Sequence, residues 1–219
     1  MGAVMIRFIV LGSAALFTLA TTAHAADPAG KPASTIEFWS GPYAGVHAGY
    51  GSGRARDVDA SGPDSYRDID GWLGGVQIGL NTRMNGLVLG VEGDIAATGI
   101  GFSDVGQGFS LDGNLDWLAT IRGRVGFIPT ERVLVYGTAG VAFAGFDLDL
   151  NGGGQLFGGN GTHTGWALGA GVETMVTDKL SLKAEYLYND FGSDSYNLPD
   201  PVNIALRVHT FRIGANFQF

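Results

Sequence analysis

The chain has 219 residues, no cysteine, 37 glycines and a formal net charge of −8 at neutral pH. The acidic balance argues against nucleic acid as a partner, because nucleic-acid binding depends on basic side chains. The lack of cysteine excludes disulfides, thiolate metal sites and thiol catalysis, so the fold must depend on backbone pairing and packing.

The N-terminus has the three zones of a secretory signal peptide. Arg7 precedes an apolar run over residues 8–20, and a small-residue site follows at residues 23–25. The run is too short to cross a bilayer, which needs roughly 20 apolar residues in a helix. We therefore predict a cleaved signal peptide over residues 1–25 and a periplasmic lead over residues 26–40. The mature chain then has 12 Lys and Arg against 21 Asp and Glu, a net charge of −9.

Eight segments of the mature chain alternate apolar and other side chains with the period of two that β-strands have. They cover residues 42–51, 72–83, 86–97, 116–128, 132–146, 164–177, 179–190 and 206–219. Three connections are tight, and four are long, at about 52–71, 98–115, 147–163 and 191–205. Short periplasmic turns and long external loops are typical of outer-membrane barrels. The predicted fold class is all-β, an eight-stranded antiparallel up-and-down transmembrane β-barrel over residues 41–219.

One face of these segments carries no charged side chain, for example Val76, Ile78 and Leu80. Because Lys or Arg facing lipid at mid-bilayer costs roughly 2 to 4 kcal/mol, this face is predicted to point outward into lipid. A soluble lipocalin-type barrel would need the reverse arrangement, with an apolar inside and a charged outside. The opposite face here is mostly glycine with balanced ions, which disfavours that alternative.

The charges of the opposite face are predicted to form one layer inside the barrel. Counted from the periplasmic turns, they lie at similar heights, on the order of 10 to 20 Å up the strands. The layer consists of Glu92, Asp94, Arg122, Arg124, Glu173, Lys183, Glu185 and Arg212. Four acids and four bases neutralise one another, so we interpret the layer as a structural plug. The alternative is a gate whose ion pairs re-form to admit ions.

The sequence resembles the OmpA-type eight-stranded barrels, and among them the small surface-antigen or porin-family proteins of alphaproteobacteria. Gly41–Gly51, Gly90–Asp94, Leu182–Tyr186 and the terminal Phe219 carry the resemblance, which covers about residues 38–219. It implies an interior cluster of two acids and two bases, at Glu92, Arg122, Glu173 and Lys183. It also implies that His47 replaces an interior base of the first strand. We expect no cell-wall-binding domain after the barrel.

The C-terminal strand ends on phenylalanine, and this resembles the signal read by the outer-membrane barrel assembly machinery. Its apolar face consists of Phe211, Ile213, Ala215, Phe217 and Phe219. Recognition would occur by pairing with the open edge of this strand before closure. The assembly machinery and periplasmic chaperones are therefore expected partners.

The four long connections with their flanks hold thirteen Asp against three Arg, so they carry the whole negative excess. The aspartates near residues 57–70 lack the spacing of a calcium loop, and we assign no metal and no cofactor. His163, between Thr162 and Thr164, is the best candidate for a catalytic group, with Asp116 or Asp190 across the rim. No spacing motif supports it, so we predict no enzyme activity.

These observations favour an integral outer-membrane protein, in contact with lipid and lipopolysaccharide, with a structural and surface-exposed role. Two alternatives stay open. One is a narrow porin-like channel for small solutes, and the other is a surface adhesin or ligand-binding antigen that acts through the acidic loops.

Overall fold

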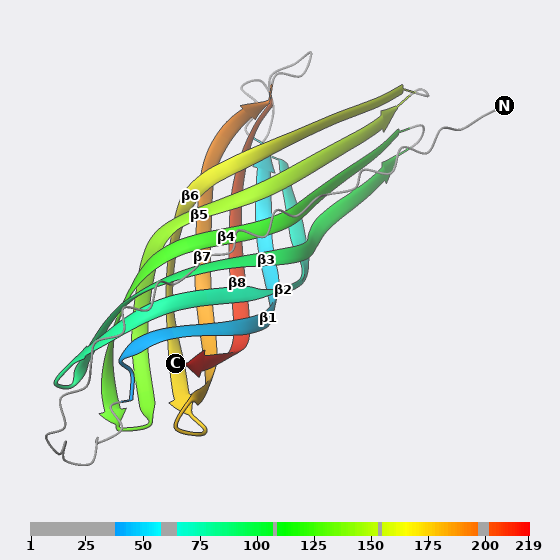
Figure 1. Cartoon of the computed structure of the whole chain (residues 1–219). Helices are drawn as coiled ribbons and strands as arrows, with labels where there is room; N and C mark the ends of the chain where they lie inside the picture. Colours follow the sequence, from blue (N-terminus) through cyan, green and yellow to red (C-terminus); the bar gives the residue numbers. More distant parts are fainter. Residues whose placement is uncertain (1–37, 58–64, 107–108, 153–154, 197–201) are drawn as a thin grey trace, which may run out of the picture. The chain divides into compact units, whose positions relative to one another are not determined.

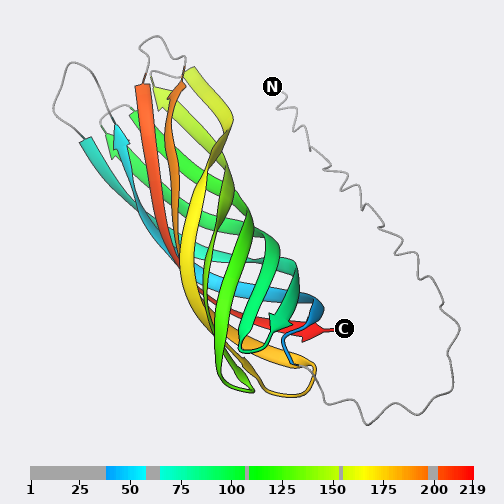
Figure 2. The same ribbon diagram turned by 90° about the vertical axis from the view of Figure 1, so that its left-hand side faces the viewer.

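The computed structural model describes residues 38–57, 65–106, 109–152, 155–196 and 202–219, which form one closed barrel. Its eight antiparallel strands are β1 (Gly41–Asp57), β2 (Ser65–Met84), β3 (Leu87–Gly106), β4 (Phe109–Thr130), β5 (Val133–Gly152), β6 (Gln155–Met175), β7 (Leu180–Tyr196) and β8 (Val202–Gln218). Each strand pairs with its neighbours in sequence, and β8 closes onto β1 (Figures 1 and 2). The predicted fold class is confirmed. The predicted signal peptide lies outside the described residues, as does most of the predicted lead.

The apolar face points outward on every strand, as a barrel in lipid requires. On β2, Val76, Ile78 and Leu80 are exposed while Gln77 and Asn81 are buried. Because successive side chains of a strand point to opposite faces, the same alternation divides the other strands into a lipid face and a lumen face. In the described part of the chain, no helix has the length and apolarity needed to cross a membrane.

Aromatic side chains gather at both ends of the outward face. Tyr50 packs edge-on against Trp72 at 5.2 Å between ring centroids, and Trp166 lies 5.3 Å from Tyr188. At the end with the tight turns, Phe217 and Phe219 pack at 5.5 Å. Such aromatic girdles mark the two interfaces of the bilayer in barrels of this kind.

The strands are longer than predicted, at 17 to 22 residues. A tilted strand needs only about 9 to 11 residues to cross a bilayer. The additional residues continue the antiparallel pairing beyond the loop-side girdle, into segments that we predicted as long loops. That prediction of their extent was wrong because pairing outside lipid needs no apolar face. It therefore leaves no alternation of apolar side chains in the sequence.

Candidate functional site in the barrel lumen

The turn-side end of the lumen is closed by an apolar cluster that begins before the first strand. Trp39 is fully buried there, and its indole Nε1 donates a hydrogen bond of 3.0 Å to the carbonyl oxygen of Glu131. Gly41 has a φ of +108°, a conformation that favours glycine and that turns the chain from Trp39 into β1. The cluster comprises Phe38, Trp39, Val88, Leu134, Tyr136 and Met175. The sequence analysis missed this cluster, although two adjacent aromatic residues directly before the first strand were its visible signal.

Above this cluster lie the eight charged residues that were predicted to share a layer, and all eight are buried. Arg122 on β4 contacts three acids: Glu92 at 2.6 Å, Asp94 at 3.0 Å and Glu185 at 3.1 Å. Arg212 on β8 contacts Asp94 at 2.7 Å. Every acid of the layer therefore has at least one base within ion-pair distance, and the two signs balance, as an interior of low dielectric requires.

Several of these ion pairs join strands that are not neighbours. The amine of Lys183 on β7 lies 3.0 Å from Glu92 on β3, four strands away and thus on the opposite wall of an eight-stranded barrel. Arg124 on β4 reaches Glu173 on β6 at 2.7 Å. The ion layer thus spans the lumen from wall to wall.

The four residues implied by the family resemblance are only partly joined to one another. Glu92 contacts both Arg122 and Lys183, whereas the basic partner of Glu173 is Arg124. Glu173 also accepts hydrogen bonds from Ser181 at 2.5 Å and Asn216 at 2.8 Å. Which base reaches which acid depends on side-chain length and strand stagger across the lumen, and neither is visible in a strand pattern.

Two buried tyrosines complete the ion layer. The Tyr43 hydroxyl donates to Glu92 at 2.7 Å and accepts a hydrogen bond from Arg124 at 2.9 Å. The Tyr136 hydroxyl donates to Glu185 at 3.0 Å, and its ring lies 4.1 Å below the guanidinium of Arg124. Both rings are polar ligands of the layer on one edge and apolar packing groups on their faces.

Glycines on the neighbouring strands make room for these two rings. A Cβ at Gly171 would lie 2.6 Å from Tyr136, and one at Gly79 would overlap the ring of Tyr43. Part of the high glycine content is therefore explained by the close approach of these side chains to the backbone.

His47, which was predicted to replace an interior base, lies beside the layer rather than within its ion pairs. Its Nδ1 is hydrogen-bonded to the side-chain carbonyl of Gln77 at 3.1 Å. The amide of Gln77 donates in turn to Asn216 at 2.5 Å, and Asn216 donates to Glu173. His47 is thus joined to the ion layer through two neutral amides.

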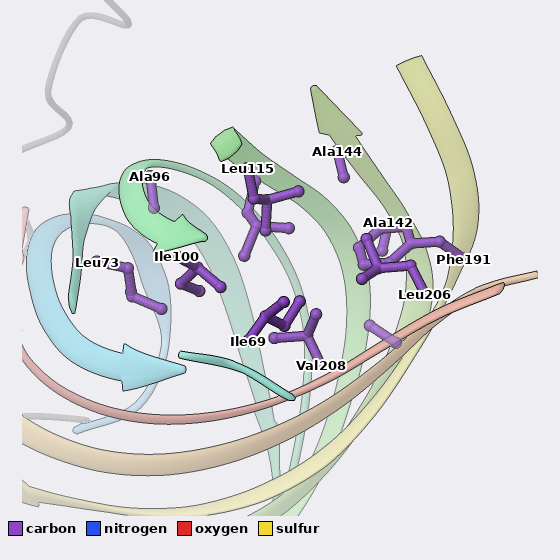
Figure 3. Close-up of a cluster of buried hydrophobic side chains, with 12 residues drawn as sticks. Ile69, Leu73, Ala96, Ile100, Leu115, Ala142, Ala144, Phe191, Leu206 and Val208 are labelled. Carbon is purple, nitrogen blue, oxygen red and sulfur yellow. The ribbon is translucent and has the colours of Figure 1, made fainter. Parts of the chain in front are cut away.

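The loop-side half of the lumen is apolar, which corrects our expectation of an inner face made of glycine and ions. Figure 3 shows aliphatic side chains from several strands directed toward one another. The apolar core consists of Ile69, Leu73, Ala96, Ile100, Leu115, Leu118, Ala142, Ala144, Ala167, Phe191, Leu206 and Val208. These residues occupy inward positions on strands whose outward positions are also apolar. The alternation was therefore weakest here, and the expectation failed.

The histidine considered for catalysis has no triad geometry. His163 is buried on the lumen face of β6, whereas the flanking Thr162 and Thr164 are exposed on its outer face. A nucleophile and its base must lie within hydrogen-bond reach, which opposite faces of a strand do not allow. Among the described residues, no group of three or more His, Cys, Asp or Glu is arranged to hold a metal ion.

Comparison with known proteins identifies the family. The family model "Outer membrane protein beta-barrel domain" matches residues 13–219. The chain belongs to this family. It is 34% identical to the 31 kDa outer-membrane immunogenic protein of Brucella melitensis, over 97% of this chain and 100% of that protein. It is also 32% identical to the 25 kDa outer-membrane immunogenic protein of the same organism, over 98% of this chain and 99% of that one.

A solved structure shows the same fold at low sequence identity. The outer membrane protein OprG from Pseudomonas aeruginosa matches with a TM-score of 0.50 and 13% identity, over 85% of this chain and 100% of that one. The family, the relatives and the outward apolar face agree that this is an integral protein of the outer membrane. The predicted resemblance and the predicted localisation are both confirmed.

Proposed function

We propose that this member of the outer-membrane barrel family is a structural, surface-exposed envelope protein whose lumen is plugged by its charge network. The observation that carries the proposal is the contact between Lys183 and Glu92, which ties opposite walls of the barrel across its centre. Apolar clusters lie on both sides of that ion layer. No catalytic role, metal or cofactor is part of the proposal.

The energetics of the ion layer favour a plug. A solute that passes through the barrel must separate pairs such as Arg124 and Glu173, which are both buried. Stranding one partner of a buried pair costs roughly 3 to 5 kcal/mol. Several pairs share partners in this layer, so one separation disturbs the others. A closed state is therefore strongly preferred.

Conductance in planar bilayers tests the plug. The refolded wild type is expected to conduct far less than a large porin. The variant Glu92→Gln/Lys183→Met removes one acid and one base, keeps the layer balanced and deletes the contact across the centre. If it still folds, as judged by heat-modifiable migration in gels, its conductance should exceed that of the wild type.

A matched control is Arg132→Gln/Asp178→Asn, which removes an ion pair of 3.5 Å at the turn end outside the lumen. This control should conduct like the wild type. Sustained large steps from the wild type would instead support the narrow porin-like channel. A folded lumen variant that conducts no more than the wild type would show that the apolar clusters seal the barrel without the charges.

The adhesin alternative has an observation of its own, the acidic surface beyond the loop-side girdle. Asp68, Asp70, Asp116 and Asp147 are exposed on the strand extensions. The Brucella relatives are named as immunogenic, which supports exposure of the corresponding segments here. A depletion strain scored for detergent sensitivity, envelope shape and host-cell attachment separates the two roles. Loss of attachment with an intact envelope would favour the adhesin.

The last strand supports a proposed interaction with the barrel assembly machinery. Phe211, Ile213, Phe217 and Phe219 are exposed on the outer face of β8, and Ala215 lies on the same face. Before β8 closes onto β1, its edge is free to pair with another strand. Deletion of Phe219 should lower the yield of folded barrel in cells while leaving refolding in detergent intact. Normal assembly of that truncation would contradict this role.

A further inference from the structure

A row of charged side chains crosses the outer face of the barrel just above the loop-side girdle. Pairing between strands places five residues in one continuous row over β2, β1, β8, β7 and β6. In that order they are Asp68, Arg54, Arg207, Asp190 and Trp166. The two arginines therefore occupy directly opposite positions on adjacent strands.

Like charges in directly opposite positions destabilise a sheet, because their side chains start only about 5 Å apart. Each arginine is held on its far side by an acid: Arg54 Nε donates to Asp68 at 3.1 Å, and Arg207 Nε donates to Asp190 at 3.1 Å. The side chains of Arg54 and Arg207 are nevertheless 74% and 64% exposed. An anion between them would relieve their repulsion and accept hydrogen bonds from both guanidinium groups.

An apolar groove begins directly below this row on the same face. It has a volume of about 710 Å³. Tyr50, Phe211 and Tyr186 form one row at its loop-side end, and small side chains such as Ala48 and Ala184 line it below. Such a groove faces the hydrocarbon of the outer leaflet and has the length and polarity of an acyl-chain site.

His209 lies between the arginine row and the groove. It is outward-facing on β8, its ring packs 5.0 Å from that of Tyr188, and its Nδ1 is hydrogen-bonded to the Tyr186 hydroxyl at 2.6 Å. The surface thus changes from charged to polar to apolar over about four residues of β8. A phosphorylated lipid has the same sequence of chemistry from headgroup to acyl chain.

We infer that this face binds one molecule of lipid A, the phosphorylated and acylated part of lipopolysaccharide, with a phosphate at Arg54 and Arg207 and an acyl chain in the groove. The loop side of the barrel faces the outside of the cell, and lipopolysaccharide fills that leaflet. The position of the arginines on the loop side favours this lipid over a glycerophospholipid. The site lies outside the lumen and is independent of the proposed plug.

The test measures lipid A retained by the refolded full barrel in detergent, by native mass spectrometry. The variant Arg54→Gln/Arg207→Gln should lose affinity for lipid A by about tenfold or more, since hydrogen bonds to charged groups contribute strongly. The control Arg132→Gln/Lys179→Gln removes the same charge at the turn end and should bind like the wild type. The variant Ala184→Trp, which fills the groove, should also weaken binding while the barrel stays folded.

Two further arms identify the ligand. Dephosphorylated lipid A should bind the wild type weakly, and should bind the double arginine variant no more weakly still. Phosphatidylglycerol should bind much less tightly than lipid A. Equal retention of lipid A by the wild type and the double arginine variant would overturn the inference. Equal affinity for phosphatidylglycerol would also overturn it, because the site would then be a general anionic-lipid surface.

Discussion

The two halves of the lumen are filled by opposite chemistry, although both are lined by the same inward-facing positions of the same strands. The turn-side half holds the ion layer, in which each charge depends on named partners such as Arg122 and Asp94. The loop-side half holds the apolar core, in which Leu118 or Ile100 contacts only other apolar groups. Both fillings exclude water, but only the ion layer requires a unique set of partners. We expect this difference to appear in how each half responds to a single deletion.

The largest effect is expected from Arg122→Met in the ion layer. Arg122 serves Glu92, Asp94 and Glu185 at once, so its loss leaves buried acids undercompensated. The free energy of unfolding should fall by roughly 3 to 5 kcal/mol. Urea titration of the barrel in lipid vesicles, followed by tryptophan fluorescence, measures this change. A loss below about 1 kcal/mol, the value typical of exposed pairs, would mean that the layer is solvated.

A smaller and less specific effect is expected from Leu118→Ala in the apolar core. Leu118 lies between Ala96 and Ala144 on the neighbouring strands, so its truncation leaves a cavity that small neighbours cannot fill. We expect a loss of about 2 to 5 kcal/mol, toward the lower end if the barrel contracts. The control Ile121→Ala lies on the lipid face of the same strand, where lipid fills the space. An equal loss in the control would show that the loop-side lumen is not packed.

The two halves also differ in how far the sequence predicted them. The lipid face was predictable because no charge is tolerated there, and the depth of Glu92 or Lys183 followed from counting along each strand. The contact of Glu173 with Arg124 was not predictable, because strand stagger and side-chain reach across the lumen leave no local pattern. The loop-side core was missed because residues such as Leu118 stand beside outward apolar residues, so apolarity marks neither face. Trp39 was missed because it precedes the alternating segments.

A third prediction concerns the fit between the ion layer and its wall. In Gly171→Ala the new methyl group meets Tyr136, which is fixed by Glu185 and Arg124 and cannot move without disturbing them. Overpacking of this kind typically costs about 1 to 3 kcal/mol. The control Gly137→Ala points into lipid on the adjacent strand, with its nearest neighbour at 3.9 Å, and should be close to neutral. If both variants unfold like the wild type, the Tyr136 ring is not held in place.

The smallest effect is expected from Arg132→Gln, which separates burial from charge as the source of the first result. Arg132 pairs with Asp178 at 3.5 Å at the turn end, where the two side chains are 52% and 56% exposed. Exposed pairs contribute only about 0 to 1 kcal/mol, because water solvates both ions when the pair is broken. The same urea titration should therefore give a change several times smaller than for Arg122→Met. Added salt should reduce that change further, since exposed pairs are screened, whereas the buried layer should respond little. A comparable loss in both variants would show that the stability of this barrel depends on its total positive charge rather than on pairing inside the lumen.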